Sequence, residues 1–162
     1  LEIGFDGYGY GGWPLDSDNQ LVEEMVRLLR ELIPADYSMH ALGIGHPPYI
    51  ARCTEIGYGL FDSAMPTRDA RHGRLYTFSG TPHPASLAHG DDWFEYTYVN
   101  DKRHIKSSAP IEETCDCPAC AHYSLGYIRH LFKINDSLFQ QLATQHNLAF
   151  MARLMKLLRQ VL

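Results

Sequence analysis

The sequence of 162 residues lacks any run of 18 apolar residues, which a helix needs in order to cross a membrane. It also lacks a charged start followed by an apolar segment, so we expect no secretory signal peptide. Internal repeats and low-complexity segments are absent as well. We therefore expect a soluble protein of the cytoplasm that has no membrane partner.

An initial Met is missing too, and the chain begins with a pattern that predicts a strand over residues 1–5. It ends abruptly after a helical pattern. Its content of 45% hydrophobic and 12% aromatic residues can bury one core or part of a larger one, which argues against wholesale disorder. We expect a fragment of a longer protein.

Positive charge is scarce, because 14 Lys and Arg residues face 19 Asp and Glu residues and the net charge is −5. This balance argues against indiscriminate binding to nucleic acid. The distribution is uneven: residues 1–60 carry a net charge of −6 and residues 124–162 carry a net charge of +4. A local basic surface is therefore expected near the C-terminal end.

The N-terminal part alternates between strand and helix patterns. Apolar residues with helical spacing predict a helix over residues 21–32. Asp18 or Asn19 would cap this helix, and Pro34 would stop it. Its apolar face is expected to contain Leu21, Val22, Met25, Leu28, Leu29 and Leu32.

The same alternation continues to residue 62. A strand over 38–42 is followed by a turn, a helix over 48–56 that ends at Gly57, and a short strand over 60–62. Successive units of strand, loop and helix predict parallel strands joined by crossover helices. Three such strands cannot bury both faces of a parallel sheet, so further strands are expected outside this sequence.

The middle of the chain, over residues 75–111, is rich in aromatic and β-branched residues among His, Pro and Gly, and we interpret it as a small irregular β region. From Ser124 onward the pattern is helical again. One face of the final helical stretch contains Leu138, Leu142, Ala149, Phe150, Leu154 and Leu158.

Only four cysteines are present, yet Cys115, Cys117 and Cys120 lie within six residues. A disulfide is disfavoured, because a reducing cytosol opposes it and neighbours in a C-x-C sequence would close a strained ring. Three thiolates from one tight turn suit tetrahedral zinc, which usually takes Cys or His as its fourth ligand. A group of buried thiols without metal is the alternative.

Three histidines follow the cysteines, namely His122, His130 and His146, and spacing alone does not choose among them. His122 lies too close to Cys120 to complete a good tetrahedron. His146 occupies a core-facing position, where an imidazole without a ligand would need another polar partner. A core histidine with one hydrogen bond is the alternative, but the incomplete set of three cysteines favours His146 as a ligand.

Taken together, these residues resemble the C-terminal half of the tRNA-guanine transglycosylases. The family's zinc motif, C-x-C-x2-C followed by x25-H, is matched by Cys115, Cys117, Cys120 and His146. Its nucleophile motif resembles "FDSAMPTRDAR" at residues 61–71. Its Gly-Gly substrate loop and M-G-V-G turn resemble Gly11-Gly12 and "LGIG" at residues 42–45. The matches follow the family's order along nearly the whole chain.

The resemblance implies an α/β fold, the C-terminal part of a TIM (β/α)8 barrel with an inserted zinc-binding subdomain. Residues 1–74 would form the last strands and helices of the barrel with its catalytic loop. Residues 75–146 would form the irregular β region and the zinc-binding subdomain, and 147–162 the C-terminal part of the closing helix. Active sites of such barrels lie at the carboxyl ends of the strands. The expected strands place the glycine-rich turn, "LGIG" and Asp62 at such ends.

By resemblance, Asp62 is the nucleophile that attacks C1′ of a guanosine in the tRNA anticodon loop, so that a 7-deazaguanine base replaces guanine. A carboxylate can hold the activated sugar as a covalent glycosyl intermediate. From the residue alone, Asp62 would be interpreted as a turn residue that caps the next segment. The resemblance also implies Zn2+ as the metal.

The resemblance implies that four residues bind the base, namely Gly11, Gly12, Leu42 and Gly43. The backbone of a glycine turn can approach a flat base closely. Plain turn geometry is the alternative for the glycines.

Arg68, Arg71 and Arg74 follow the nucleophile closely and are expected to contact phosphate or the anticodon loop. A solvated charged loop is the alternative. The final helix adds Arg153, Lys156 and Arg159 to the expected RNA-binding surface.

A second hypothesis is a noncatalytic, zinc-dependent RNA-binding subunit or dimer partner, in a homodimer or a heterodimer of the family. Departures near the base pocket support it: "GGWPLD" at residues 11–16, Leu42 in place of Met, and Ser63 after the nucleophile. The family's general acid/base belongs to its N-terminal half, so this chain alone is expected to be inactive. The sequence leaves open which 7-deazaguanine is inserted, and whether tRNA or DNA is the substrate.

Overall fold

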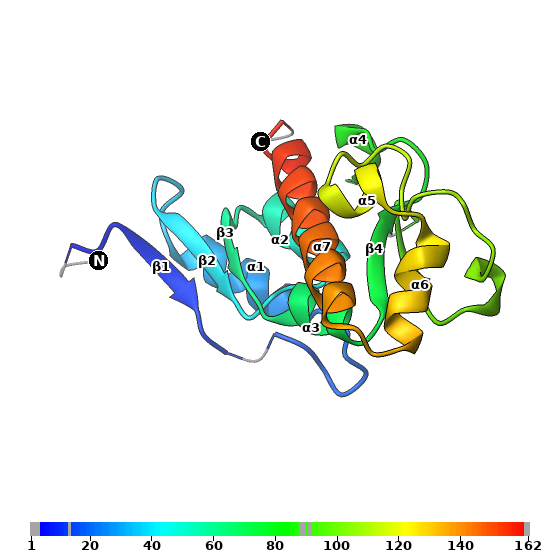
Figure 1. The fold of residues 1–162 in the computed structure, drawn as a ribbon. Helices are drawn as coiled ribbons and strands as arrows, with labels where there is room; N and C mark the ends of the chain where they lie inside the picture. The colour runs from blue at the N-terminus through cyan, green and yellow to red at the C-terminus, as the bar shows by residue number, and fades with distance from the viewer. Residues whose placement is uncertain (1–3, 13, 88–89, 91, 161–162) are drawn as a thin grey trace. The chain divides into compact units, whose positions relative to one another are not determined.

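A computed structural model describes residues 4–12, 14–87, 90 and 92–160. The chain is mixed α/β and folds into two compact units, residues 1–64 and residues 65–161 (Figure 1). We call them the N-terminal unit and the C-terminal unit. No helix among the described residues is long and apolar enough to cross a membrane.

The N-terminal unit is built on a three-stranded parallel sheet in the order β1-β2-β3 (Figure 1). The strands are β1 (Gly7–Tyr10), β2 (Ser38–Leu42) and β3 (Leu60–Asp62). The helices α1 (Glu23–Leu32) and α2 (Pro47–Ile56) provide the crossovers between them. The prediction of parallel strands joined by crossover helices is therefore confirmed.

The second crossover agrees with the sequence in detail. Strands β2 and β3 have the predicted bounds, and α2 starts one residue before the predicted start. Gly57 ends α2 with a φ of +106°, a left-handed conformation that glycine adopts without a side-chain clash.

The first strand was predicted in the wrong place. Residues 1–3 lie outside the described residues, and Gly4 and Phe5 are not in a strand. Strand β1 instead begins at Gly7, where a Cβ atom would lie 2.9 Å from the carbonyl oxygen of Ser38. Glycine permits this close pairing with β2, and the apolar pattern at the start of the chain gave no sign of it.

The start of α1 also differs from the prediction. Asp18 and Asn19 do not cap the helix, which begins at Glu23 after Val22. They belong to a turn in which Asp16 Oδ1 accepts hydrogen bonds from two backbone N–H groups, 2.8 Å and 2.9 Å away. On the helix itself Val26 is the buried residue, whereas three members of the predicted apolar face, Met25, Leu28 and Leu32, are exposed.

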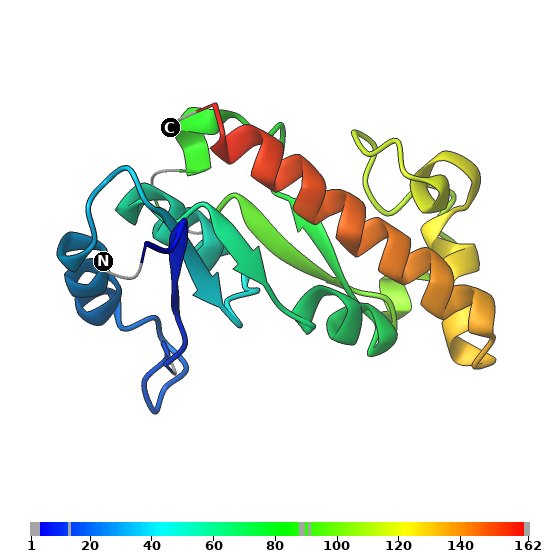
Figure 2. The ribbon, with the colours of Figure 1, turned by 90° about the vertical axis from the view of Figure 1, so that its left-hand side faces the viewer.

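The C-terminal unit contains an antiparallel pair and a long helix that packs along it. Helix α3 (Met65–Arg71) leads into β4 (Arg74–Phe78), and β5 (Phe94–Tyr98) pairs with β4. The connection between the two strands includes α4 (Pro84–Leu87). Figure 2 shows α7 (Ser137–Leu158) running beside this pair. Both strands overlap the middle segment in which the sequence predicted β structure.

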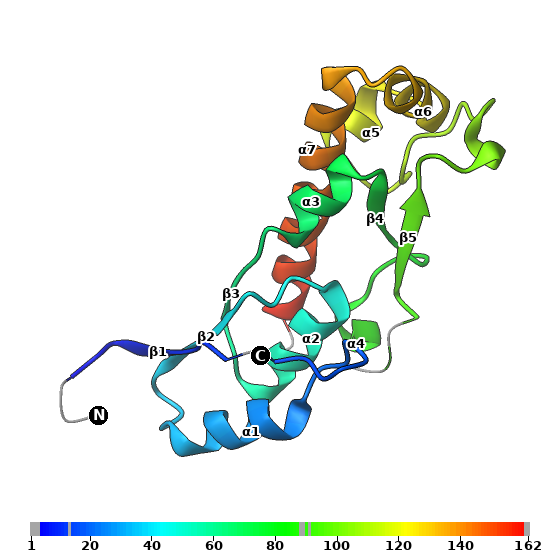
Figure 3. The same ribbon diagram turned by 90° about the horizontal axis from the view of Figure 1, so that it is seen from below.

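Between β5 and α7 the chain forms a 3-10 turn, η1 (Lys102–His104), and two helices, α5 (Pro118–His122) and α6 (Leu125–Lys133). Figure 3 shows α5 and α6 beside the first half of α7, where both pack against it. Local capping explains the helix starts, because Ser124 caps α6 and Asp136 caps α7.

The core of the C-terminal unit lies between these helices and strand β4. Four residues of the predicted face of α7 are buried, and Leu138 and Ala149 are partly buried against the same core. One cluster of buried residues in this core contains Leu142 together with Leu75, Val99, Ile111, Leu125, Ile128, Leu131, Phe139, Cys115, Cys117 and Cys120. The boundary between the two compact units in the sequence follows Ala64. The expected division at residues 74 and 146 stays a prediction.

Candidate metal centre and candidate active site

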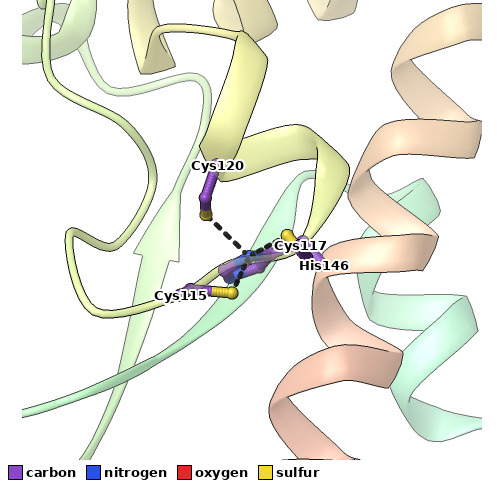
Figure 4. A group of neighbouring side chains, drawn as sticks. All are labelled: Cys115, Cys117, Cys120 and His146. Carbon is purple, nitrogen blue, oxygen red and sulfur yellow. Dashed lines mark hydrogen bonds between the residues drawn. The ribbon is translucent and has the colours of Figure 1, made fainter.

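The three clustered cysteines come from one short loop and the first turn of α5. Cys117 directly precedes the helix, and Pro118 and Cys120 both lie in its first turn. Cys115 approaches from the loop before them. Figure 4 shows their sulfur atoms around the ring of His146, which α7 supplies. The four ligand atoms lie within 4.8 Å of one another, and all four side chains are buried.

The orientation of His146 is fixed by its second ring nitrogen. Nε2 lies 2.8 Å from the carbonyl oxygen of Tyr76, which can only accept a hydrogen bond. Nε2 is therefore the protonated nitrogen, and Nδ1 of the neutral ring presents its lone pair to the three sulfurs. Metal-binding histidines usually donate their other N–H to a carbonyl or carboxylate in this way.

The distances within the cluster fit a tetrahedral zinc ion. Zinc binds sulfur at about 2.3 Å and histidine nitrogen at about 2.0–2.1 Å, so tetrahedral geometry places each sulfur about 3.6 Å from the nitrogen. The distances from His146 Nδ1 to the sulfurs of Cys115, Cys117 and Cys120 are 3.9, 3.6 and 3.3 Å. The donor set and its spacing both match a closed Cys3His site.

Hydrogen bonds within the cluster lower the pKa of Cys115 and raise the pKa values of Cys120 and His146. The hydrogen bond with the Cys120 thiol lowers the pKa of Cys115 to about 3, against the opposing effect of burial. Cys115 is therefore a thiolate, the form that binds metal. Burial acts to lower the pKa of His146, but hydrogen bonds with Cys115 and Cys117 outweigh it and raise the pKa to about 9, so the ring has to release a proton before Nδ1 can bind a metal.

The structure decides between the three candidate histidines and tests for a disulfide. His122 and His130 are exposed and do not belong to the cluster. All four cysteines are free, so the described residues contain no disulfide. The structure therefore confirms that His146 joins the three cysteines.

The candidate nucleophile lies at an edge of the parallel sheet in the N-terminal unit. Asp62 is the last residue of β3 and pairs with Leu42, the last residue of β2. Its Oδ1 lies 3.3 Å from the backbone N–H of Gly43 and 2.9 Å from Nε2 of His40. The Asp62 side chain is 63% exposed, so the carboxylate is both held and accessible.

The predicted base-binding residues lie at the same edge, because parallel strands end side by side. Gly11 and Gly12 follow β1, and Leu42 and Gly43 end β2. Gly43 has a φ of +76°, which favours glycine there and turns its N–H toward Asp62. A Cβ atom on Gly12 would lie 2.8 Å from the ring of Tyr10, so a side chain at this position would require that ring to shift.

Comparison with known proteins identifies the family. The family model described as Queuine tRNA-ribosyltransferase matches residues 1–162. The chain belongs to this family. The resemblance found in the motifs is thus confirmed, and the buried Cys3His cluster of this family member supports zinc binding.

Three curated relatives named Queuine tRNA-ribosyltransferase illustrate the similarity. The protein of Thermoanaerobacter pseudethanolicus is 33% identical over 162 residues, covering 100% of this chain and 39% of the relative. That of Shewanella halifaxensis is 35% identical over 162 residues, covering 98% and 38%. That of Protochlamydia amoebophila is 38% identical over 155 residues, covering 96% and 36%. The chain spans about two fifths of the length of these relatives.

The arginines that were predicted to contact RNA differ in how far they are free to do so. Arg68 and Arg71 are exposed on α3. Arg74 Nη2 instead forms an ion pair with Oδ1 of the fully buried Asp69 at 2.6 Å, although its side chain is still 37% exposed. Arg153 on α7 is largely buried and donates to Glu112 Oε1 at 2.9 Å.

Sequence reasoning missed two polar residues of these sites. His40 reaches Asp62 only because the register of β2 and β3 brings together residues that are 22 positions apart. Asn147 is fully buried beside His146 and makes three hydrogen bonds of 3.0 Å, to the N–H of Tyr76 and the carbonyls of Pro66 and Arg74. A His-Asn pair at a core-facing helical position was the available signal for Asn147.

Proposed function

We propose that this chain is the catalytic C-terminal part of a tRNA-guanine transglycosylase, in which Asp62 forms a covalent link to the RNA. The proposal gains most support from one observation: an accessible carboxylate stands at the carboxyl edge of a parallel sheet and accepts the N–H of Gly43. The three strands would be the last strands of a TIM (β/α)8 barrel, whose active site lies at that edge. The rest of the barrel would supply the general acid/base.

The reaction proceeds by two displacements at C1′ of the target guanosine. In the first, an Asp62 oxygen forms a bond to C1′, the C1′–N9 bond breaks, and guanine departs with its electron pair and takes up a proton. In the second, N9 of a 7-deazaguanine base attacks C1′ and gives its proton to the general base, while the electron pair of the C1′–O bond returns to the carboxylate. Two inversions give retention, as in retaining glycosidases, and no nucleoside triphosphate is needed.

The target base must leave the RNA stack to reach Asp62. Gly11 and Gly12 lack side chains at the sheet edge, so backbone groups there can approach a flat heterocycle closely. Leu42 is 39% exposed beside Gly43 and offers an apolar surface for the base. These four residues are the proposed base-binding residues for guanine and the 7-deazaguanine.

Arg68, Arg71 and Arg74 are the proposed contacts to the anticodon loop of the tRNA, since arginine contacts phosphate through several N–H donors. Arg68 and Arg71 are exposed, and Arg74 retains N–H groups beyond the one that faces Asp69. Arg153 is committed to Glu112, so the basic surface on α7 reduces to Lys156 and Arg159.

The proposed metal is Zn2+, held by Cys115, Cys117, Cys120 and His146. A closed set of four protein ligands is typical of a structural site, and bound zinc supplies a cross-link there rather than catalysis. These residues would tie the loop before α5 to α7. We place the protein in the cytoplasm and expect it to act as a homodimer or a heterodimer within the family.

A noncatalytic zinc-dependent RNA-binding or dimer-partner subunit is the second candidate. The specific observation that favours it is the altered sequence beside the base pocket, "GGWPLD" at residues 11–16 with Leu42 and Ser63. Such a subunit would bind tRNA without exchanging a base.

Exchange of labelled guanine into tRNA by the full-length gene product tests the proposal. Asp62→Asn keeps the shape of the side chain but removes the anionic nucleophile, so exchange should fall by about three orders of magnitude or more while tRNA affinity changes little. Asp36→Asn is the matched control at an exposed aspartate and should exchange at the parent rate. Exchange by Asp62→Asn near the parent rate contradicts the assignment. A parent protein that binds tRNA without exchange supports the second candidate.

A further inference from the structure

The side chains of His40 and Asp62 meet across two neighbouring strands. His40 pairs with Leu60, and Leu42 pairs with Asp62, so His40 and Asp62 are diagonal neighbours on one face of the sheet. Their closest atoms, His40 Nε2 and Asp62 Oδ1, are 2.9 Å apart. An ionised carboxylate only accepts hydrogen bonds, so Nε2 carries the proton and donates it.

The two hydrogen-bond donors in the site, His40 and the backbone of Gly43, face the same oxygen of Asp62. The N–H of Gly43 lies 3.3 Å from Oδ1, the oxygen that also faces His40. Among the residues that the structure describes, no hydrogen bond reaches Oδ2 of Asp62. One oxygen is thus held from two sides, and the other points into accessible space on a side chain that is 63% exposed.

The surroundings of His40 do not require a histidine for packing. Its side chain is 34% exposed, and the residue opposite it on β1 is Gly9, which offers no side chain to contact. Within the described part of the chain, the one hydrogen bond recorded for the ring goes to Asp62. A residue needed only for the core would be more deeply buried.

We propose that His40 is a positioning residue for the nucleophile: it fixes the Asp62 carboxylate so that Oδ2 is the oxygen that attacks C1′. This inference rests on the proposed function, since it assigns a role at the same site. A carboxylate on an exposed side chain rotates freely unless it is held, and reactions of this kind depend on the near-attack orientation of the reacting atom.

The bonding changes are compatible with this arrangement at each step. When Oδ2 bonds to C1′, the electron pair of the C1′–N9 bond leaves with guanine, and Oδ1 becomes the carbonyl oxygen of the ester while it still faces His40 and Gly43. When the incoming base attacks C1′, the electron pair of the C1′–Oδ2 bond returns to the carboxylate. The free carboxylate occurs at both ends of the reaction, so the donors assist mainly by orienting Oδ2.

Three variants of the full-length gene product test the role. His40→Phe keeps a ring of similar size without a donor, and His40→Gln keeps an N–H at a comparable reach. His122→Phe makes the same change at an exposed histidine outside the site. The measurements are kcat and KM for guanine exchange into tRNA, the rate of covalent adduct formation in a single turnover, and tRNA affinity.

We expect His40→Phe to lower kcat and the rate of adduct formation by about 10- to 100-fold, with KM and tRNA affinity within about twofold of the parent. His40→Gln should recover most of the loss, and His122→Phe should match the parent. If His40→Phe does not fold, His40→Gln and His40→Ala carry the same comparison, with only the latter slow.

Two results overturn the inference: an adduct rate within twofold of the parent in the variant that lacks a donor, or an equal loss in His40→Gln. Failure of the proposed function itself has a different signature, because Asp62→Asn would then exchange normally. Loss of activity in Asp62→Asn together with a normal His40→Phe contradicts only the role of His40.

Discussion

His146 holds strand β4 through Tyr76: its Nε2 donates to the Tyr76 carbonyl at 2.8 Å, while its Nδ1 faces the three cysteine sulfurs. The next residue, Asn147, accepts the N–H of Tyr76 at 3.0 Å. Two successive residues of α7 thus satisfy both backbone groups of one strand residue. The candidate metal centre is thereby connected to the sheet, and local order in the C-terminal unit should depend on the metal.

The first prediction concerns zinc content. The reduced protein should contain one zinc per chain, and His146→Ala should lose it, because the variant leaves three ligands for a four-ligand site. His130→Ala, at an exposed histidine outside the cluster, is the control and should retain zinc. Elemental analysis of the purified proteins decides the matter. Reduced parent protein without zinc, or His146→Ala with full zinc, contradicts the assignment.

Removal of the metal should loosen the fold around it, since binding energy at structural zinc sites is largely folding energy. A chelator should increase hydrogen exchange at the Tyr76 amide and in α5, whereas the N-terminal unit should be affected much less. If the Tyr76 amide exchanges at the same rate after complete metal loss, the connection through His146 does not stabilise the strand.

Asn147 should matter for stability independently of the metal. Asn147→Leu has a similar size but removes the hydrogen bonds to the Tyr76 N–H and to the carbonyls of Pro66 and Arg74, which should lower the free energy of unfolding by about 2–4 kcal/mol. Gln140→Ala, at an exposed position of α7, serves as control. Urea unfolding of zinc-loaded protein measures both variants, and a loss below about 0.5 kcal/mol for Asn147→Leu refutes the expectation.

A buried carboxylate lies at the other side of Tyr76. The Tyr76 hydroxyl donates to Asp69 Oδ2 at 2.9 Å, and Arg74 pairs with Oδ1. Burial raises the pKa of Tyr76 most, and the hydrogen bond to Asp69 raises it further. The hydroxyl therefore keeps its proton and remains a donor. Asp69 lies on α3 between Arg68 and Arg71, so this network also anchors the helix that carries the proposed RNA contacts.

Arg74→Met should therefore destabilise the protein by about 2 kcal/mol or more, because it removes the nearer cation of the buried Asp69 and leaves only Arg68, whose Nε lies 4.0 Å from Oδ1. Combining it with Asp69→Asn should recover much of that loss. Arg71→Met, at an exposed arginine on the helix that carries Asp69, should stay within about 0.5 kcal/mol of the parent. Equal effects of Arg74→Met and Arg71→Met in thermal or urea unfolding count against the ion pair.

RNA binding should depend on salt through the exposed arginines. Replacing Arg68 and Arg71 by Gln should reduce the magnitude of the slope of log affinity against log salt by about 1.4, since each phosphate contact with single-stranded RNA contributes about 0.7. Arg27→Gln in α1 is the control substitution and should leave the slope unchanged. Titration of the tRNA anticodon stem-loop at several salt concentrations gives the slopes. A slope that does not change in the double variant places the RNA elsewhere.

The elements that were predicted well are those determined by local chemistry. Gly57 ends α2 with the left-handed conformation that glycine favours, and Ser124 begins the helical pattern that it caps. The candidate metal-binding cluster was also predictable, because three cysteines in six residues restrict the chemistry and His146 occupies a core-facing position.

The features that were missed depend on pairing between distant residues. Strand β1 forms where Gly7 and Gly9 approach β2 closely, and weak strand propensity concealed it. The contact between His40 and Asp62 follows from the register of β2 and β3, which no local pattern specifies. The ion pair between Asp69 and Arg74 was hidden for the same reason, since Arg74 was predicted only as an RNA contact.

The most direct test of the central claim is to trap the covalent intermediate. The full-length gene product is incubated with tRNA and a base that reacts slowly in the second step, and is then denatured, digested and mapped by mass spectrometry. We predict a hydroxylamine-sensitive ribosyl adduct on the peptide that contains Asp62, and no adduct in Asp62→Asn. An adduct on another carboxylate, or an equally abundant adduct in Asp62→Asn, contradicts the account.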